Sequence, residues 1–292
     1  MSEKFDRRIH PVRPDLAARA YEGRVQADRF VDGTVKQVTA DRLSMRPEPR
    51  RDKSIDTELL FGETVTVFEE TMEGWAWGQL ETDGYVGWFS SDGLGALEAS
   101  THIVRALRTY RYPGPDLKFP PLGLISMGAK VTVTGRATTR GLDYALLSDG
   151  SAVVARHLAG LDQFETDWVA VAEEFLGTPY LWGGRSSLGL DCSALVQLAA
   201  QAGGYDVPRD SDMQVAGAGE AIDTSDLDAL QRGDLVFWKG HVGIVQSPNR
   251  LLHANGHTMT VASEPLDRAV ARIAENEFGN VTGMRRLRRQ VR

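Results

Sequence analysis

Cysteine is almost absent from this chain, which holds a single one, Cys192, among its 292 residues. One cysteine excludes an intramolecular disulfide and the paired cysteines of most structural zinc sites. The patterns HExxH and GxxxxGK[ST] are also missing, which argues against a catalytic zinc site and a Walker-type phosphate loop. We therefore expect no metal and no organic cofactor.

Long apolar runs and a positive charge excess are missing too. No run approaches the roughly 18 apolar residues of a membrane-spanning helix, and the first 20 residues hold no apolar core of a secretory signal. The net charge of −7 offers no concentrated basic face for a nucleic acid or an anionic membrane. A short basic cluster from residue 285 to 292 is typical of a solvated tail. We expect a cytoplasmic protein that binds neither nucleic acid nor membrane.

The first half of the chain predicts an N-terminal segment followed by β-structure. Residues 1–33 are expected to form an extended arm and then a helix over 15–30, with Asp15 as its N-cap. Residues 34–98 contain ETVTVFEE, which alternates like a strand, and Asp83-Gly84, a hairpin turn signal. Residues 99–162 partly repeat this texture in AKVTVTGRA. We interpret the two segments as two copies of one small β-barrel.

Residues 163–292 mix helices and strands. ETDWVAVAEEFLG predicts one helix, and a second begins near Cys192. Four strand-like stretches then follow, namely GDLVFWKG, HVGIVQS, RLLHANG and TVASEP. Helices followed by a run of strands indicate an α+β domain.

The single cysteine lies in LGLDCSALVQLAAQAGG, where the predicted helix begins. An isolated cysteine is most often a small buried hydrophobic residue. At a helix N-terminus, however, unpaired N–H groups and the helix dipole favour the thiolate, which is the nucleophile. The position of Cys192 therefore makes it a candidate nucleophile.

A cysteine nucleophile needs a base, and three of the six histidines share its domain: His241, His253 and His257. A hairpin centred near Ser247 would place His241 directly opposite His253. His253 would then orient the imidazole of His241, as the third member of a catalytic triad does. A bulge in the hairpin would bring Asn255 or His257 into that place instead.

The stretch TPYLWGG adds Tyr180 and Trp182 close upstream of the cysteine. The hydroxyl of Tyr180 could point at the thiolate or at a reaction oxyanion, and the alternative is a packed aromatic ring. Backbone N–H groups at Cys192 and Ser193 would help to stabilise the oxyanion.

Four stretches occur in an order that resembles the NlpC-type cell-wall cysteine peptidases. They are PYLWGGRSSLGLDCSALV, PRDSDMQ, RGDLVFWKGHVGIV and LLHANG, and the resemblance covers roughly residues 165–290. The upstream repeat resembles the bacterial SH3 domains that precede this peptidase in some members. The resemblance implies an α+β papain-like cysteine peptidase domain preceded by two small SH3-like β-barrels. Ala194 departs from the glycine common in the family, and residues 1–33 match nothing in it.

The resemblance also implies roles for residues. Cys192 would be the nucleophile, His241 the base and His253 its orienting partner, with Tyr180 near the oxyanion. One branch of the family cleaves γ-D-glutamyl–diamino acid bonds in muropeptides during cytoplasmic murein recycling. It releases L-Ala–γ-D-Glu and binds the free amine of the peptide. The diamino acid here is expected to be meso-diaminopimelate, with lysine as the alternative that the sequence leaves open. The predicted substrate contacts are Trp182, Asp191, Ser193, Arg209, Asp210 and Ser211, with Glu48 and Tyr85 from the first barrel.

Several alternatives stay open at this point. Glu48 and Tyr85 are equally a surface glutamate and a tyrosine packed in a barrel core. The chain as a whole could be a cell-wall peptide-binding module without turnover, or another papain-like amidase or acyltransferase. The same peptidase chemistry could also act outside the cell on intact murein.

Overall fold

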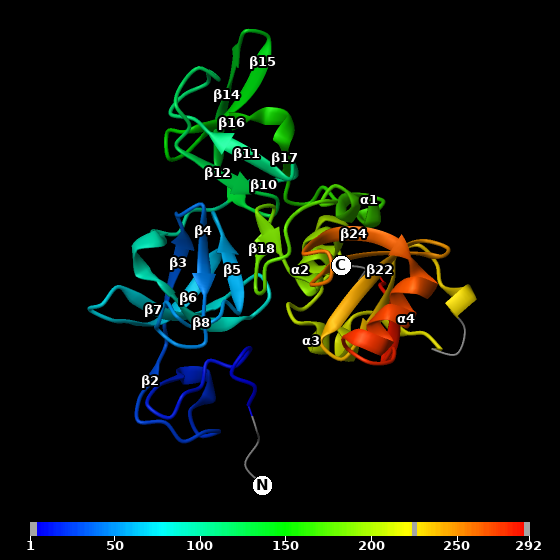
Figure 1. Cartoon of the computed structure of the whole chain (residues 1–292). Helices are drawn as coiled ribbons and strands as arrows, with labels where there is room; N and C mark the ends of the chain where they lie inside the picture. Colours follow the sequence, from blue (N-terminus) through cyan, green and yellow to red (C-terminus); the bar gives the residue numbers. More distant parts are fainter. Residues whose placement is uncertain (1–4, 224–226, 289–292) are drawn as a thin grey trace. The chain divides into compact units, whose positions relative to one another are not determined.

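The computed structural model describes residues 5–223 and 227–288 (Figure 1). The chain forms two compact units, Met1–Leu161 and Asp162–Arg292. Within the described ranges, no helix combines the length and the apolar character that crossing a bilayer would need.

The first barrel begins at Thr34. Its strands are β3 (Thr34–Val38), β4 (Arg42–Met45), β5 (Thr57–Leu60), β6 (Thr64–Glu70), β7 (Trp75–Leu80), β8 (Val86–Ser90) and β9 (Leu94–Gly95). They form a five-stranded sheet, β8-β7-β6-β3-β9, and the hairpin β4-β5. Val65 and Val67 of β6 point into the core, as the alternation predicted, and Gly84 turns between β7 and β8 with φ 74°.

The second barrel repeats the strand pairing of the first. Its strands are β10 (His102–Val104), β11 (Arg108–Arg111), β12 (Gly123–Ser126), β13 (Lys130–Val131), β14 (Val133–Thr139), β15 (Leu142–Leu147), β16 (Ala152–Val154) and β17 (Leu158–Gly160). Strands β13 and β14 together take the place of β6, because β10 pairs with β13 and β17 as β3 pairs with β6 and β9, and β14-β15-β16 corresponds to β6-β7-β8. A single 3-10 turn precedes the last strand in both copies, η2 (Ser91–Gly93) and η3 (Ala155–His157). The structure confirms the internal repeat.

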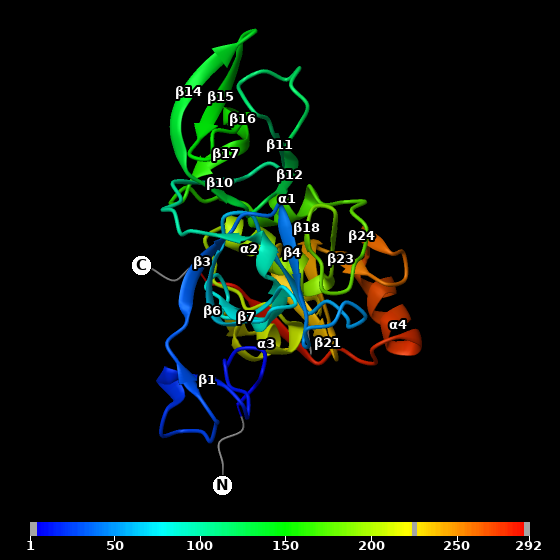
Figure 2. The same ribbon diagram turned by 90° about the vertical axis from the view of Figure 1, so that its left-hand side faces the viewer.

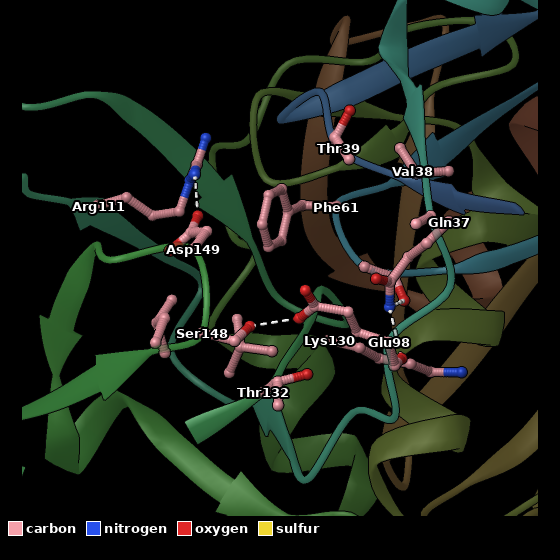
Figure 3. A pocket seen from close by; sticks show the side chains of 14 residues that line it. Gln37, Val38, Thr39, Phe61, Glu98, Arg111, Lys130, Thr132, Ser148 and Asp149 are labelled. Atoms are coloured by element: carbon pink, nitrogen blue, oxygen red, sulfur yellow. Dashed lines mark hydrogen bonds and ion pairs between the residues drawn. The ribbon is translucent and has the colours of Figure 1, made fainter. Parts of the chain in front are cut away.

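An arginine links the two barrels. The guanidinium of Arg111 lies 4.4 Å from the centre of the Phe61 ring and donates to Asp41 Oδ1 at 2.9 Å and Asp149 Oδ2 at 3.0 Å. Figure 3 shows Phe61, Arg111 and Asp149 around a pocket of about 220 Å³ that is lined by both barrels. Since Phe61 and Asp41 belong to the first barrel and Arg111 and Asp149 to the second, the two barrels share one interface.

The backbones of the two barrels also meet directly. The N–H of Lys130 donates to the carbonyl of Phe61 at 2.8 Å. At Gly62, where φ is 76°, a Cβ atom would lie 1.9 Å from the carbonyl oxygen of Lys130. Only glycine fits at this point, because the approach leaves no room for a side chain.

The N-terminal segment packs against the first barrel, so the predicted arm and helix are wrong. Its described part forms β1 (Ala17–Ala18), η1 (Arg19–Tyr21) and β2 (Phe30–Val31), in which β1 and β2 pair in parallel. Asp15 accepts from the Arg13 guanidinium at 3.0 Å instead of capping a helix. Leu16 packs with Trp77, Val86 and Trp88 of the barrel. Burial of Leu16 therefore outweighs the weak helical pattern of this segment.

The second unit contains a six-stranded antiparallel sheet. Its strand order is β20 (Glu220–Ala221), β25 (Gly283–Arg286), β21 (Asp234–Trp238), β22 (His241–Ser247), β23 (Arg250–Asn255) and β24 (Thr260–Pro265). Strands β21 to β24 confirm the four strands that the sequence predicts. A two-stranded hairpin, β18 (Arg185–Ser186) and β19 (Gly189–Leu190), precedes the nucleophile helix.

Helices cover both faces of this sheet. They are α1 (Trp168–Glu173), α2 (Cys192–Ala202), α3 (Ser211–Gly217) and α4 (Leu266–Asn276). Figures 1 and 2 show α2 and α4 on opposite sides of the sheet. Helix α4 packs its Leu266, Ala269 and Ile273 on Val245 and Leu251. The sheet is thus enclosed, with α2 contacting β22 and β23 on the side away from α4.

The C-terminal basic cluster is not a solvated tail at Arg285 and Arg286, whereas the side chain of Arg288 is 65% exposed, as predicted. Arg286 lies in β25 and forms a 2.7 Å ion pair with the buried carboxylate of Asp234. Arg285 donates to the carbonyl of Val215 at 2.7 Å. These arginines therefore hold the last strand in the sheet, and Arg289 and Arg292 lie outside the described residues.

Candidate active site

Cys192 is the first residue of α2 and is buried. The preceding residue, Asp191, is the N-cap, and its Oδ1 accepts from the N–H of Ala194 at 2.9 Å. The predicted position of the cysteine at a helix N-terminus is confirmed.

The expected thiolate is not the resting state. Burial, with a smaller contribution from the Asp191 carboxylate, raises the pKa of the Cys192 thiol to about 12. Hydrogen bonds from the backbone N–H groups of Val242 and Ser193 lower this pKa only in part. Burial therefore raises the pKa of the thiol more than the helix N-terminus lowers it, and the thiol needs a base to lose its proton. The bond from Val242 places the sulfur at the residue that follows His241.

His241 and His253 form a buried pair. The Nε2 atom of His241 lies 2.8 Å from Nδ1 of His253, and the ring of His241 stacks on Phe278 with centroids 5.2 Å apart. Burial, with a smaller effect of the neighbouring His253 ring, lowers the pKa of His241 to about 3. The imidazole of His241 and the thiol of Cys192 are thus both neutral at neutral pH.

The predicted histidine contact is confirmed, but the predicted register is wrong. Strands β22 and β23 pair Ile244 with Leu252, with a bulge near the turn, so His241 and His253 are not directly opposite. They meet diagonally, a separation that long side chains on one face still span. The bulge does not substitute another residue: Asn255 accepts from the N–H of Thr258, and His257 is exposed.

Three of the predicted substrate contacts bind one another. Arg209 is fully buried and donates to both carboxylate oxygens of Asp191, at 2.9 and 2.7 Å. It also donates to Ser193 Oγ at 2.9 Å, and Gly183 N–H donates to Asp191 Oδ2 at 3.0 Å. This network holds the start of α2 in place, so the geometry gives Asp191, Ser193 and Arg209 a positioning role. Direct contact with substrate stays a prediction for all three.

Tyr180 lies close to the nucleophile. Its side chain is half-buried, and its pKa is raised first by burial and next by the nearby Cys192. The ring is therefore within electrostatic reach of the sulfur, while its part at the oxyanion stays a prediction. Trp182, on the same loop, is 65% exposed and is available to a ligand.

Asp210 and Ser211 begin the short helix α3, as N-cap and first residue, and both are half-buried. Helix α3 is tied to the nucleophile helix by Gln214, whose buried side-chain amide donates to the carbonyl of Ser193 at 3.0 Å and to that of Pro208 at 2.8 Å. The sequence analysis did not single out Gln214. Its position one helical turn after Asp210 is the signal that would have placed both residues on the same face of α3.

Glu264 was also missed. Its Oε1 lies 2.8 Å from Nε2 of His253, on the far side of the ring from His241. The only sequence signal was its place in the strand-like stretch TVASEP, which does not reveal the neighbouring strand.

Glu48 and Tyr85 belong to the other unit. Tyr85 is buried in the core of the first barrel with Val38 and Phe89, in agreement with the packing alternative. Glu48 forms a 2.8 Å ion pair with Lys53. Their contribution to a substrate pocket stays a prediction.

The donor set favours nucleophilic chemistry. Across residues 5–223 and 227–288, no group of three or more His, Cys, Asp or Glu side chains is arranged to hold a metal ion. The site holds a buried cysteine at a helix N-terminus, a neutral histidine on the strand whose Val242 N–H reaches the sulfur, and a second histidine bonded to the first. These are the parts of a cysteine peptidase.

Comparison with known proteins agrees with this site. Residues 177–273 match the NlpC/P60 family, and residues 45–94 match the bacterial dipeptidyl-peptidase Sh3 domain. A γ-D-glutamyl-L-lysine dipeptidyl-peptidase of Bacillus subtilis is 31% identical over 226 residues, which cover 70% of this chain and 73% of that protein. Dipeptidyl-peptidase 6 of Lysinibacillus sphaericus is 34% identical over 102 residues, about a third of each chain.

The fold is shared with a solved structure. A NlpC/P60 family protein from Bacillus cereus superposes with a TM-score of 0.71, covering 87% of this chain and 99% of that one at 20% identity. The chain is thus a cysteine peptidase of the NlpC/P60 family, with a bacterial SH3 domain of dipeptidyl-peptidase type ahead of its papain-like domain.

Proposed function

We propose that this peptidase hydrolyses the γ-D-glutamyl–diamino acid bond of short muropeptides that carry a free N-terminal amine, and releases L-Ala–γ-D-Glu. The observation that carries the proposal is the 31% identity to the B. subtilis γ-D-glutamyl-L-lysine dipeptidyl-peptidase, which extends over 70% of this chain. The buried Cys192 and the buried, hydrogen-bonded pair His241–His253 support it with the chemistry that such a hydrolysis needs.

In the proposed reaction, these groups take the following roles. His241 takes the thiol proton as the sulfur of Cys192 attacks the γ-glutamyl carbonyl. Backbone N–H groups at the start of α2 stabilise the oxyanion. The tetrahedral intermediate collapses, His241 returns the proton to the departing amine of the diamino acid, and a thioester remains on the sulfur. Water, deprotonated by His241, then attacks the thioester and frees both the dipeptide acid and the thiol.

The specificity for a free amine would come from a carboxylate near the nucleophile. Asp210 is the candidate, because it is half-buried and follows Arg209, which contacts the nucleophile helix directly. An ammonium bound by a carboxylate at a fixed distance from the sulfur would set the cleavage point two residues from the peptide end. We further propose that the enzyme acts on such short free peptides in the cytoplasm, during murein recycling.

Mass spectrometry of the products tests this function. L-Ala–γ-D-Glu–meso-diaminopimelate and L-Ala–γ-D-Glu–L-Lys are incubated with the full chain, each with a free and with an acetylated N-terminus, and Cys192→Ala measures the background. We expect dipeptide release from the free-amine peptides alone. Equal cleavage of acetylated peptides, or of whole murein sacculi, would remove the amine recognition and the recycling role. Absence of release from every peptide would contradict the proposed substrate class.

A further inference from the structure

We infer that Glu264 is a positioning residue that fixes the proton positions of both active-site histidines, so that His241 presents an unprotonated Nδ1 as the base. The inference rests on the cysteine peptidase chemistry of the site and does not depend on which peptide is cleaved.

The three side chains form a row across the sheet. His241, His253 and Glu264 lie on the adjacent strands β22, β23 and β24. Within β23 and β24, His253 pairs with Ala262 and Glu264 with Leu251, so Glu264 reaches His253 diagonally, just as His253 reaches His241. The two contacts have the same length, 2.8 Å from His241 Nε2 to His253 Nδ1 and from His253 Nε2 to Glu264 Oε1.

The carboxylate decides which way the hydrogen bonds run. An ionised carboxylate only accepts, so Nε2 of His253 must carry a proton and donate it to Glu264. In neutral His253 the Nδ1 atom is then an acceptor, and Nε2 of His241 must be the donor. Since neutral His241 has one ring proton, its Nδ1 is unprotonated. A single charge at the end of the row therefore sets both tautomers.

Helix α4 keeps that carboxylate charged and in place. Arg272 donates to the same Oε1 atom of Glu264 at 2.5 Å and also pairs with Glu277. The hydrogen bond from His253, and next that from Arg272, lower the pKa of Glu264 to about 2. Glu264 is thus ionised throughout the range in which the thiol and the imidazole react.

Substitution of Glu264 by glutamine removes this constraint with little change in shape. The amide of Glu264→Gln can donate to Nε2 of His253 as well as accept from it. When it donates, the proton of His253 moves to Nδ1, the bond to His241 reverses, and His241 carries its proton on Nδ1, where it cannot act as the base. The matched control is Glu277→Gln, which neutralises the other carboxylate that pairs with Arg272 and leaves the His253–Glu264 contact in place.

The experiment combines a tautomer measurement with two reactivity measurements on the full chain. Two-bond ¹H–¹⁵N spectra assign the ring protons, and the six histidines are few enough to resolve. The rate at which iodoacetamide alkylates Cys192 measures how readily the base deprotonates the thiol, without any substrate. Dipeptide release gives kcat and KM. We expect protons on Nε2 of His241 and His253 in the wild type. Glu264→Gln should lose Cys192 reactivity and kcat by about 10- to 100-fold, less than loss of the right tautomer at the base itself, with KM nearly unchanged.

The control and the conservative variant complete the design. Glu277→Gln should stay within about twofold of the wild type, and Glu264→Asp should recover part of the rate because it restores an acceptor that cannot donate. A wild-type spectrum with the proton on Nδ1 of His253 would overturn the inference even if Glu264→Gln failed to fold. Equal alkylation rates in Glu264→Gln and Glu277→Gln would also overturn it. If no peptide is cleaved, the spectra and the alkylation rates still decide the role of Glu264.

Discussion

The two units of the chain keep their polar side chains in different places. In the barrel unit, many ion pairs, such as Arg50–Asp52 with side chains 58% and 64% exposed, lie at the surface, while Glu58 and Glu63 are buried. In the peptidase unit, the Arg209–Asp191 pair is buried and so are His241 and His253. Burial of polar groups away from water is unfavourable unless every group is bonded. The peptidase unit accepts that cost where it positions reacting atoms.

The largest effect that would sharpen this comparison is on turnover. His241→Gln removes the base from a buried neutral thiol, and we expect dipeptide release to fall by about 10⁴-fold, the upper range for general base catalysis. The matched control is His102→Gln in the barrel unit, where the ring contacts the exposed Thr101 hydroxyl. That variant should keep the wild-type rate. Similar losses in both variants would contradict the assignment of chemistry to the peptidase unit.

The next effect is on stability. Arg209→Met leaves the carboxylate of Asp191 buried without its cation, and we expect a loss of about 3–5 kcal/mol in the unfolding free energy of the peptidase unit. Arg50→Met breaks a solvent-exposed pair and should cost less than about 1 kcal/mol. Urea unfolding, followed by fluorescence and by activity, measures both. Equal costs would show that the two units do not differ in how they use their ion pairs.

A third substitution tests where the barrel unit ends. Leu16→Ala creates a cavity beside Trp77 and Trp88, and we expect the barrel unit to lose about 2–4 kcal/mol. Val35→Ala, at a side chain that is 44% exposed, is the control and should change stability by less than about 0.5 kcal/mol. Thermal unfolding monitored by tryptophan fluorescence reports both. If Leu16→Ala behaved like its control, the N-terminal segment would not belong to the barrel.

The last effect, and per pH unit the smallest, is on the pH dependence of stability. Folding lowers the pKa of His241 to about 3 from an ordinary value near 6.5, so between these values the unfolded chain binds more protons. The stability of the peptidase unit should therefore fall as the pH drops through this window, by at most about 1.4 kcal/mol per pH unit for one proton. His241→Gln should remove that part of the slope in urea titrations between pH 6.5 and 4.5. An unchanged slope would contradict the buried neutral imidazole.

Most strands and turns were predicted from short stretches of sequence, because alternation of apolar residues and turn residues act locally. ETVTVFEE alternates because β6 buries one face, and Asp83-Gly84 turns because Gly84 has a positive φ. The helix predicted in the N-terminal segment was wrong, because packing of Leu16 against the first barrel overrides a weak helical pattern.

The candidate site was predictable where it rests on residue identity and not where it rests on three-dimensional neighbours. Cys192, His241 and His253 were predicted from their motifs. The contact between the two histidines forms despite the incorrect register, because residues placed diagonally on neighbouring strands can still reach each other. The pKa of the Cys192 thiol is raised because the side chain is buried, and no short stretch of sequence reveals that burial. Glu264 joins the row from a strand whose pairing register the sequence does not specify.

The measurement that tests the account most directly is the mass of the enzyme during turnover. The full chain is mixed with L-Ala–γ-D-Glu–diamino acid peptide, quenched in acid within the first turnovers and digested, beside Cys192→Ala. The account predicts an L-Ala–γ-D-Glu acyl group on the fragment that contains Cys192, and no dipeptide release by Cys192→Ala. Release by Cys192→Ala at the wild-type rate, with no acyl group on the wild-type fragment, would contradict it.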